Sequence, residues 1–201
     1  MGTAAPGCPA GRSPAGCWLV VTYAHEEAVD SDRGDLREVP DKELVQKVIG
    51  SVLDFVGELS PGEDDYELVR QTPKSAQFFW AMRLLESEVN NGGFEQYFWN
   101  SSCTLADVAL EAYQAIGAHK YVVFLKRALE LAGSGSWRER RGRSGSDWKA
   151  YKKACPREMD ALDNEFYAAG CGDQDSGGGD QDLYAKKIDY IRKNARAVSC
   201  I

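Results

Sequence analysis

The stretch Asn90-Asn91-Gly92-Gly93-Phe94-Glu95-Gln96-Tyr97-Phe98 separates two helical patterns and decides how they can be arranged. Asparagine and glycine tolerate positive φ angles, so the chain can leave one helix here and turn sharply. Phe94, Tyr97 and Phe98 follow at spacings i, i+3 and i+4, which place their aromatic rings on one helical face. Aromatic rings on a shared face pack well into a core. The stretch therefore predicts a turn followed by an aromatic plug, which is a structural role.

Helical spacing continues upstream of this stretch. Pro40 opens a predicted helix, because a proline and early acidic residues suit a first turn. Its apolar side chains recur every three or four residues: Leu44, Val48, Val52 and Phe55. A second helix is expected from Thr72 as N-cap and Pro73 as first residue up to the Asn-Asn-Gly-Gly stop. Its apolar face carries Phe78, Met82, Leu85 and Val89.

Two more helices are predicted directly downstream. Thr104 and Asp107 form a variant capping box in front of an amphipathic helix. Gly117 is a natural stop for that helix. Residues 119–132 repeat the helical spacing, so the two helices are expected to form an antiparallel hairpin.

The whole chain is expected to belong to the all-α class. Pro156 opens a further predicted helix, and Asp182 is expected to cap the last one. No segment sustains the apolar–polar alternation of a strand. Residues 1–39, rich in Gly, Pro and Ala before a charged stretch, predict a variable, partly disordered extension. Residues 40–201 are predicted to form a single helical domain of about six to eight helices.

The net charge of −7 is unevenly distributed. Residues 41–100 hold 11 acidic and 5 basic residues, a net −6, whereas residues 137–160 hold 4 acidic and 8 basic residues, a net +4. An acidic first half argues against direct nucleic-acid binding, which needs a basic face. Five acidic residues without an intervening base, which we name the 58–67 acidic run, are Glu58, Glu63, Asp64, Asp65 and Glu67.

The sequence predicts a cytoplasmic protein without a membrane segment. Its apolar runs, such as residues 18–21, are far shorter than the ~20 residues that cross a bilayer. Residues 1–16 lack the basic start and apolar stretch of a secretory signal. The six cysteines include no CxxC pair and lie away from the two histidines. Neither a zinc site nor a disulfide framework is therefore expected.

No catalytic, metal or cofactor site is predicted from the remaining residue types. A nucleophilic triad needs a base beside Ser or Cys, and only His25 and His119 are available. The glycine clusters lack the lysine or the preceding strand that nucleotide-binding motifs require. Asp173, Asp175 and Asp180 lack the residue order of a calcium-binding loop.

Carboxylates near the central stretch could pair as acid and base, and they are Glu86, Glu88, Glu95 and Glu111. The first two lie two residues apart on a helix, so their side chains diverge by about 200°. We therefore expect a solvated face at these positions. An alternative is a small-ligand pocket or an active site lined by Glu95, Gln96 and Asn100.

Residues 88–102 resemble the signature of a bacterial domain family of unknown function, and the resemblance continues through residues 109–118 and returns at residues 162–167. The family is named for the C-terminal domain of the nineteen-kilodalton DNA-mimic protein. The resemblance covers about residues 40–200 and implies a helical fold and a homodimer. It also implies carboxylates that imitate DNA phosphates and occupy the DNA-binding surface of a transcriptional regulator.

The first functional hypothesis is a regulatory protein-binding module that engages a basic or DNA-binding partner through an acidic surface. Duplex DNA carries one negative charge per ~1.7 Å of axis, so a mimic needs closely spaced acids. The 58–67 acidic run is the candidate surface. Two alternatives stay open, namely the small-ligand-binding protein or enzyme described above and an immunity-type accessory protein.

Overall fold

The computed structural model describes residues 35–59, 66–133, 151–153, 155–170 and 180–198, apart from the side chains of residues 56–59, 67 and 197. All regular elements in these segments are helical, which confirms the predicted all-α class. None of the helices in these segments is long and apolar enough to cross a membrane.

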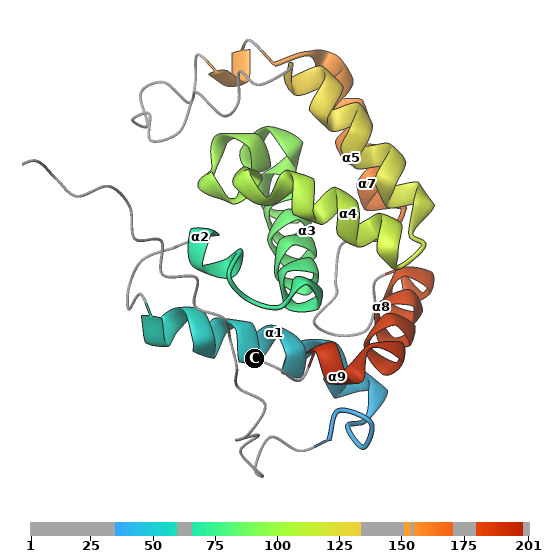
Figure 1. Cartoon of the computed structure of the whole chain (residues 1–201). Coiled ribbons are helices and arrows are strands. Elements are labelled where there is room, and N and C mark those ends of the chain that lie inside the picture. Colours follow the sequence, from blue (N-terminus) through green and yellow to red (C-terminus); the bar gives the residue numbers. More distant parts are fainter. Residues whose placement is uncertain (1–34, 60–65, 134–150, 154, 171–179, 199–201) are drawn as a thin grey trace, which may run out of the picture. The chain divides into compact units, whose positions relative to one another are not determined.

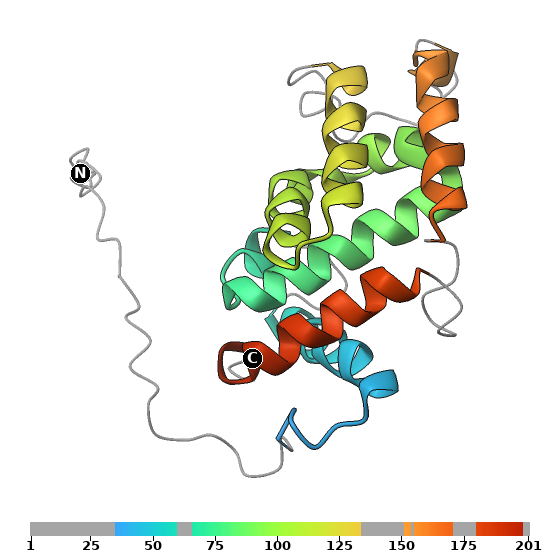
Figure 2. The same ribbon diagram turned by 90° about the vertical axis from the view of Figure 1, so that its right-hand side faces the viewer.

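The elements follow one another as α1 (Asp41–Leu59), α2 (Tyr66–Val69), α3 (Lys74–Trp99), the 3₁₀ helix η1 (Ser101–Leu105), α4 (Ala106–Ala115), α5 (His119–Ala132), α7 (Arg157–Ala168), α8 (Gln181–Lys193) and α9 (Ala195–Val198). The long helix α3 is central: α1 and α8 lie on one side of it, and α4, α5 and α7 lie on the other (Figure 1, Figure 2).

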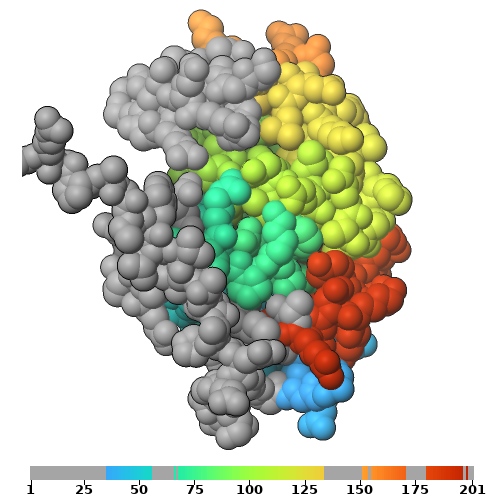
Figure 3. All heavy atoms as spheres, in the orientation of Figure 1, coloured from blue at the N-terminus to red at the C-terminus, as the bar shows by residue number. Residues whose placement is uncertain are grey.

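The core is built from the apolar stripes that the sequence predicts. On α3 the predicted residues Phe78, Met82, Leu85 and Val89 are all buried. On α1 the buried members of the stripe are Leu44, Val48 and Val52. Burying each such side chain contributes about 1.5–3 kcal/mol. In the space-filling view the atoms of α3, α4, α5 and α8 adjoin one another on the face shown (Figure 3).

The α4–α5 pair has the predicted glycine stop but not the predicted cap. Gly117 has φ +72°, and α5 begins two residues later. The capping box is wrong, because residues 101–105 form a 3₁₀ helix and Leu105 is the N-cap of α4, without a side-chain cap. Asp107 pairs instead with Arg70 at 2.9 Å. The Arg70 guanidinium also donates to the carbonyl of Thr104, which holds α2 against η1.

Two other predicted caps are shifted by one or two residues. The N-cap of α3 is Pro73 rather than Thr72, whose hydroxyl donates to the carbonyl of Val69 at 2.8 Å. The cap of α8 is Asp180 rather than Asp182. The Asp180 carboxylate accepts from the backbone N–H groups of Asp182 and Leu183 at 3.0 and 3.2 Å.

Arg192 of α8 binds the segment before α1 through hydrogen bonds and an ion pair. Its guanidinium donates to the backbone carbonyls of Leu36 and Val39 and pairs with the Asp41 carboxylate at 2.6 Å. The Tyr184 hydroxyl also donates to the Asp41 carbonyl at 3.0 Å. The start of α1 is therefore held by two side chains from the C-terminal part of the chain.

Candidate functional site at the break in α3

The central sequence stretch forms a break inside α3. Gly92 (φ −166°, ψ 25°) and Gly93 (φ +78°, ψ 178°) leave the helical conformation, and helical geometry resumes at Phe94. The predicted turn therefore lies at the two glycines, whereas Asn90 and Asn91 still belong to the first part of the helix. Phe94, Tyr97 and Phe98 are at most 1% exposed, as expected of an aromatic plug.

Helix α7 caps both sides of this break. The Asp163 carboxylate accepts a hydrogen bond from the backbone N–H of Phe94 at 2.8 Å, which satisfies a donor at the restart of the helix. One turn later on α7, the Tyr167 hydroxyl donates to the carbonyl of Val89 at 2.6 Å, before the break. Phe166 packs edge-on against Phe94 with ring centroids 5.4 Å apart. These three side chains come from residues 162–167, so two separate parts of the family resemblance meet in space.

Glycine is required at this contact for reasons of space and conformation. A Cβ on Gly93 would overlap the Asp163 Oδ2 atom and lie 2.8 Å from Asp163 Cγ. The positive φ of Gly93 is also unfavourable for any residue with a side chain. A Cβ on Gly92 would overlap the side-chain amide oxygen of Gln96. The two glycines thus let α7 and the second part of α3 approach the backbone closely.

Glu88 ties the two parts of α3 together. Its Oε2 atom accepts hydrogen bonds from the side-chain amides of Gln96 at 2.8 Å and Asn100 at 2.7 Å. Gln96 and Asn100 were predicted to line a small-ligand pocket with Glu95 in the alternative hypothesis. They are engaged by Glu88 in the structure, whereas Glu95 contacts Lys152.

Two carboxylates lie beside the break with little solvent around them. Glu95 is only 5% exposed, and its Oε2 atom lies 3.6 Å from the Lys152 ammonium. Burial raises the pKa of Glu95, and nearby Asp160 raises it further, while Lys152 opposes the change. Burial also raises the pKa of Asp163 to about 6; Glu95 and Asp160 add to the increase, and the Phe94 N–H opposes it. This arrangement can hold a proton near neutral pH.

The prediction that these glutamates lie on a solvated face is wrong for Glu86 and Glu95. Glu86 is 1% exposed and forms an ion pair with Lys187 of α8 at 2.7 Å. It also accepts a hydrogen bond from the Tyr113 hydroxyl of α4 at 3.0 Å. Glu86 therefore joins three helices inside the core. Glu111 is exposed, as expected, and pairs with Lys74 at 2.6 Å.

Most of the 58–67 acidic run lies outside the described residues. Glu58 and Glu67 belong to α1 and α2, but their side chains are not described, and Glu63, Asp64 and Asp65 lie in the segment 60–65. The basic stretch 138–153 is described only at residues 151–153. The role of the 58–67 acidic run as a binding surface therefore stays a prediction.

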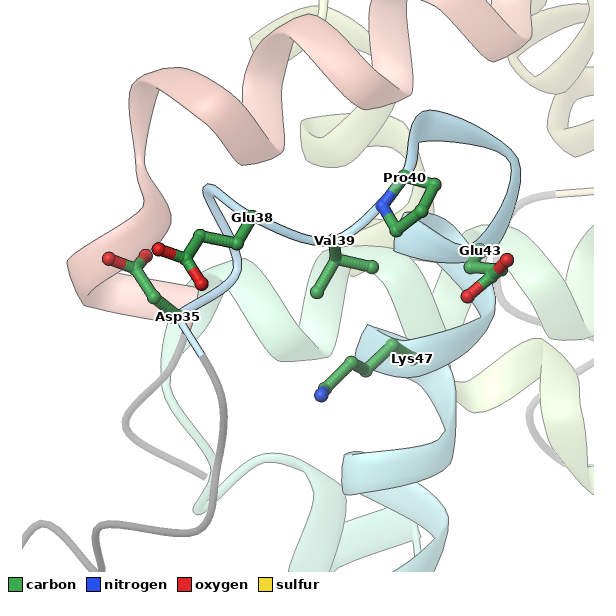
Figure 4. A pocket seen from close by; sticks show the side chains of 6 residues that line it. All are labelled: Asp35, Glu38, Val39, Pro40, Glu43 and Lys47. Carbon is green, nitrogen blue, oxygen red and sulfur yellow. The ribbon is translucent and has the colours of Figure 1, made fainter.

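An acidic hollow at the start of α1 was not predicted from the sequence. It has a volume of about 320 Å³ and is open to solvent. Asp35 and Glu38 line it from the segment before α1, and Glu43 and Lys47 line it from the first turns of the helix, around Val39 and Pro40 (Figure 4). The lining holds three carboxylates and one ammonium. A side chain outside the lining, Arg37, pairs with Asp35.

The described residues hold no group of three or more His, Cys, Asp or Glu side chains that could bind a metal ion. His119 is exposed at the first residue of α5, while His25, Asp173 and Asp175 lie outside the described residues. Neither Cys103 nor Cys155 forms a disulfide bond.

Sequence reasoning missed the partners that come from distant helices. For Asp163 and Tyr167 the sequence offered one indication of a role, because both lie in residues 162–167, where the family resemblance returns. The burial of Lys187 was also indicated by the sequence, because Lys187 lies four residues from both Leu183 and Ile191 and therefore on their buried helical face. Nothing local marked Asp160 or Lys152 as neighbours of Glu95.

Comparison with known proteins identifies a family. No curated protein and no solved structure matches the chain. The family model described as "DMP19-like protein" matches residues 70–194, which run from the end of α2 to the end of α8 and contain both the break in α3 and its caps on α7. The chain therefore belongs to the DMP19-like protein family.

Proposed function

We propose that this protein is a regulatory protein-binding module that engages a basic or DNA-binding partner through an acidic surface at the two ends of α1. One end carries the acidic hollow, and the other carries the 58–67 acidic run. The hollow is the observation that carries the proposal, because it opens to solvent and is lined by Glu38, Glu43 and Lys47 beside the Asp35–Arg37 pair. With Asp35 compensated by Arg37, the lining keeps a net charge of −1, which suits a cationic side chain.

Both acidic regions precede residue 70, where the family match begins. The family core around the break in α3 would then support the surface, while the partner is selected by the N-terminal part of the chain. This division agrees with the contacts of the break, whose side chains serve mainly to cap and bracket α3.

Charge reversal tests the proposal. One variant carries Glu38→Lys and Glu43→Lys in the hollow, and a second carries Glu63→Lys and Asp65→Lys in the acidic run. A matched control carries Glu130→Lys and Glu158→Lys, two exposed acids far along the chain, with the same change in net charge. Each tagged protein is used to capture partners from cells, and each captured partner is then purified for direct binding measurements.

The proposal expects a basic partner that binds the wild type and the control alike but binds one or both test variants at least tenfold more weakly. Binding should also weaken with salt, because exposed charges are screened within about 10 Å at 0.1 M. Duplex DNA should compete if the partner uses its DNA-binding surface. A partner whose affinity is the same for all variants, or is insensitive to salt, would show that the acidic surface is not the binding site.

A further inference from the structure

One wall of the acidic hollow depends on a side chain that lies more than 150 residues further along the sequence. Arg192, in the last turn of α8, donates hydrogen bonds to the backbone carbonyls of Leu36 and Val39 at 2.5 and 2.6 Å. Each of these two residues directly follows an acid that lines the hollow, Asp35 or Glu38. Arg192 therefore holds the backbone of the segment that presents both acids.

Residues 35–38 form a turn whose side chains differ in exposure. The Glu38 N–H donates to the Asp35 carbonyl at 2.9 Å, which closes the turn. Leu36 inside this turn is only 6% exposed and packs into the core, whereas the two acids are exposed. The turn therefore buries its apolar side chain and leaves its acids to the hollow, while Arg192 fixes its backbone to α8.

The contacts of Arg192 use both terminal nitrogens of its guanidinium. One nitrogen binds the Leu36 carbonyl. The other binds the Val39 carbonyl and the Asp41 carboxylate, each at 2.6 Å. A guanidinium presents its donors as a rigid planar fork, whereas a lysine ammonium is a single compact centre. A lysine at this position would keep the positive charge but could not bridge the same three oxygen atoms.

The acids of the hollow come from two elements whose relative position matters. Glu38 belongs to the turn, whereas Glu43 and Lys47 belong to the first turns of α1 (Figure 4). If the turn were free to move, a partner would have to restrict it on binding, and its affinity would fall by that cost. Because Arg192 restricts the turn when the chain folds, the hollow can bind without paying this cost again.

We propose that Arg192 is a positioning residue for the acidic hollow, so that a basic partner binds tightly only while the turn is fixed to α8. This rests on the function proposed above and adds a residue to it. Arg192 lies within residues 70–194, which the family model matches, whereas the lining of the hollow precedes residue 70. The family-matched part of the chain therefore contributes one side chain to the construction of the N-terminal site.

Arg192→Lys tests the positioning role without a partner, because it keeps the charge and removes the fork. Arg157→Lys makes the same change at an exposed position of α7 and is the matched control. In Arg192→Lys alone, hydrogen–deuterium exchange of residues 35–46 should be about tenfold faster, the effect of losing a hydrogen bond to a charged group. Exchange in α4 should stay at the wild-type rate. Unchanged exchange in residues 35–46, or an equal increase in α4, overturns the proposal.

Binding of a fluorescent hexa-arginine peptide to the full chain tests the consequence for a basic partner. Arg192→Lys should bind this probe about three- to tenfold more weakly than the wild type and Arg157→Lys. A variant with Glu38→Gln and Glu43→Gln should also bind more weakly. Adding Arg192→Lys to that variant should cause little further loss, because residues that act through one site are not additive. Fully additive losses would place the effect of Arg192 outside the hollow and overturn the proposal.

The two proposals fail in different ways. If the variant with Glu38→Gln and Glu43→Gln binds the probe like the wild type, the hollow is not the site, and both proposals are wrong. If that variant binds weakly but Arg192→Lys binds like the wild type, the positioning role alone is wrong. Should Arg192→Lys not fold, Tyr184→Phe replaces it, since it removes the 3.0 Å bond to the Asp41 carbonyl. Faster exchange in residues 35–46 with weaker binding then supports the proposal, and wild-type behaviour overturns it.

Discussion

Asp163 accepts a hydrogen bond from the backbone N–H of Phe94 across 69 residues of sequence. This contact lets one helix supply the N-terminal cap of another. Because Tyr167 of the same turn bonds to the carbonyl of Val89, α7 satisfies both a donor and an acceptor that the break in α3 exposes. A break inside a central helix is stable only with such partners.

Gly93→Ala should be strongly destabilising. The substitution combines a positive φ with an overlap of the new Cβ and Asp163, so we expect a loss of about 2–4 kcal/mol in the free energy of unfolding. Chemical denaturation followed by circular dichroism measures it.

Two other glycines provide matched controls for that measurement. Gly117→Ala has a positive φ but open space around its Cβ, so it should cost only about 1–2 kcal/mol. Gly50→Ala, in the middle of α1 with open space, should stabilise by about 0.5–1 kcal/mol. Equal losses for Gly93→Ala and Gly117→Ala would show that the contact with Asp163 is not tight.

Removing Lys187 should cost more than removing the whole ion pair. Lys187→Met leaves Glu86 as an uncompensated charge at 1% exposure, which we expect to cost about 3–5 kcal/mol. The double variant Lys187→Met, Glu86→Gln should recover part of this loss, because a neutral amide is easier to bury. Thermal unfolding of both variants and of each single change gives the coupling. Additive effects would contradict a direct buried pair.

Removal of two tyrosine hydroxyls should have opposite effects. The Tyr97 side chain is fully buried, and its hydroxyl has no hydrogen-bond partner among the described residues, so Tyr97→Phe should be neutral or stabilising. Tyr167→Phe removes the 2.6 Å bond to Val89 and should cost about 1 kcal/mol. The comparison needs only melting temperatures. A marked loss on Tyr97→Phe would mean that the hydroxyl has a partner after all.

Asp180 should stabilise the protein more at neutral pH than at low pH. Burial alone would raise its pKa, but hydrogen bonds from Tyr121 and from two backbone N–H groups hold the pKa of Asp180 below its usual value. Its contribution is therefore present above about pH 4 and lost as the pH falls through the lowered pKa.

The variant Asp180→Ala should lose about 1–2 kcal/mol at pH 7, a typical cost for an N-cap, and the loss should shrink at low pH. Melting curves from pH 7 to pH 2.5 test this, with Asp182→Ala as the control for a nearby exposed acid. A loss that stays constant over the whole range would contradict the capping role.

The helices were predictable because their determinants are local. The stripes at Leu44 and Val48 and at Phe78 and Met82 needed only a period of about 3.6 residues. The position of Gly117 followed from its tolerance of positive φ. The caps were less accurate: Thr104 and Asp107 have the right residue types, but a 3₁₀ helix shifts the start of α4 to Ala106.

The contacts that build the site were beyond local reasoning. Glu86 lies four residues after Met82 and three before Val89, so its position on the buried face was visible, but its partner Lys187 is 101 residues away. Asp163 likewise reaches Gly93 through tertiary packing that no spacing rule gives. Sequence patterns indicate which face of a helix is buried, whereas pairing between distant charges depends on how whole helices cross.

The bonds from Arg192 to Leu36 and Val39 have a consequence for the order of events during synthesis. They join positions 156 and 153 residues apart, so the segment before α1 cannot be fastened until almost the whole chain has been translated. At about 5–20 residues per second, the ribosome needs roughly 8–30 s to make that intervening chain. The apolar stripe of α1 can pack against α3 much earlier, so the anchor at the start of α1 is among the last contacts to form.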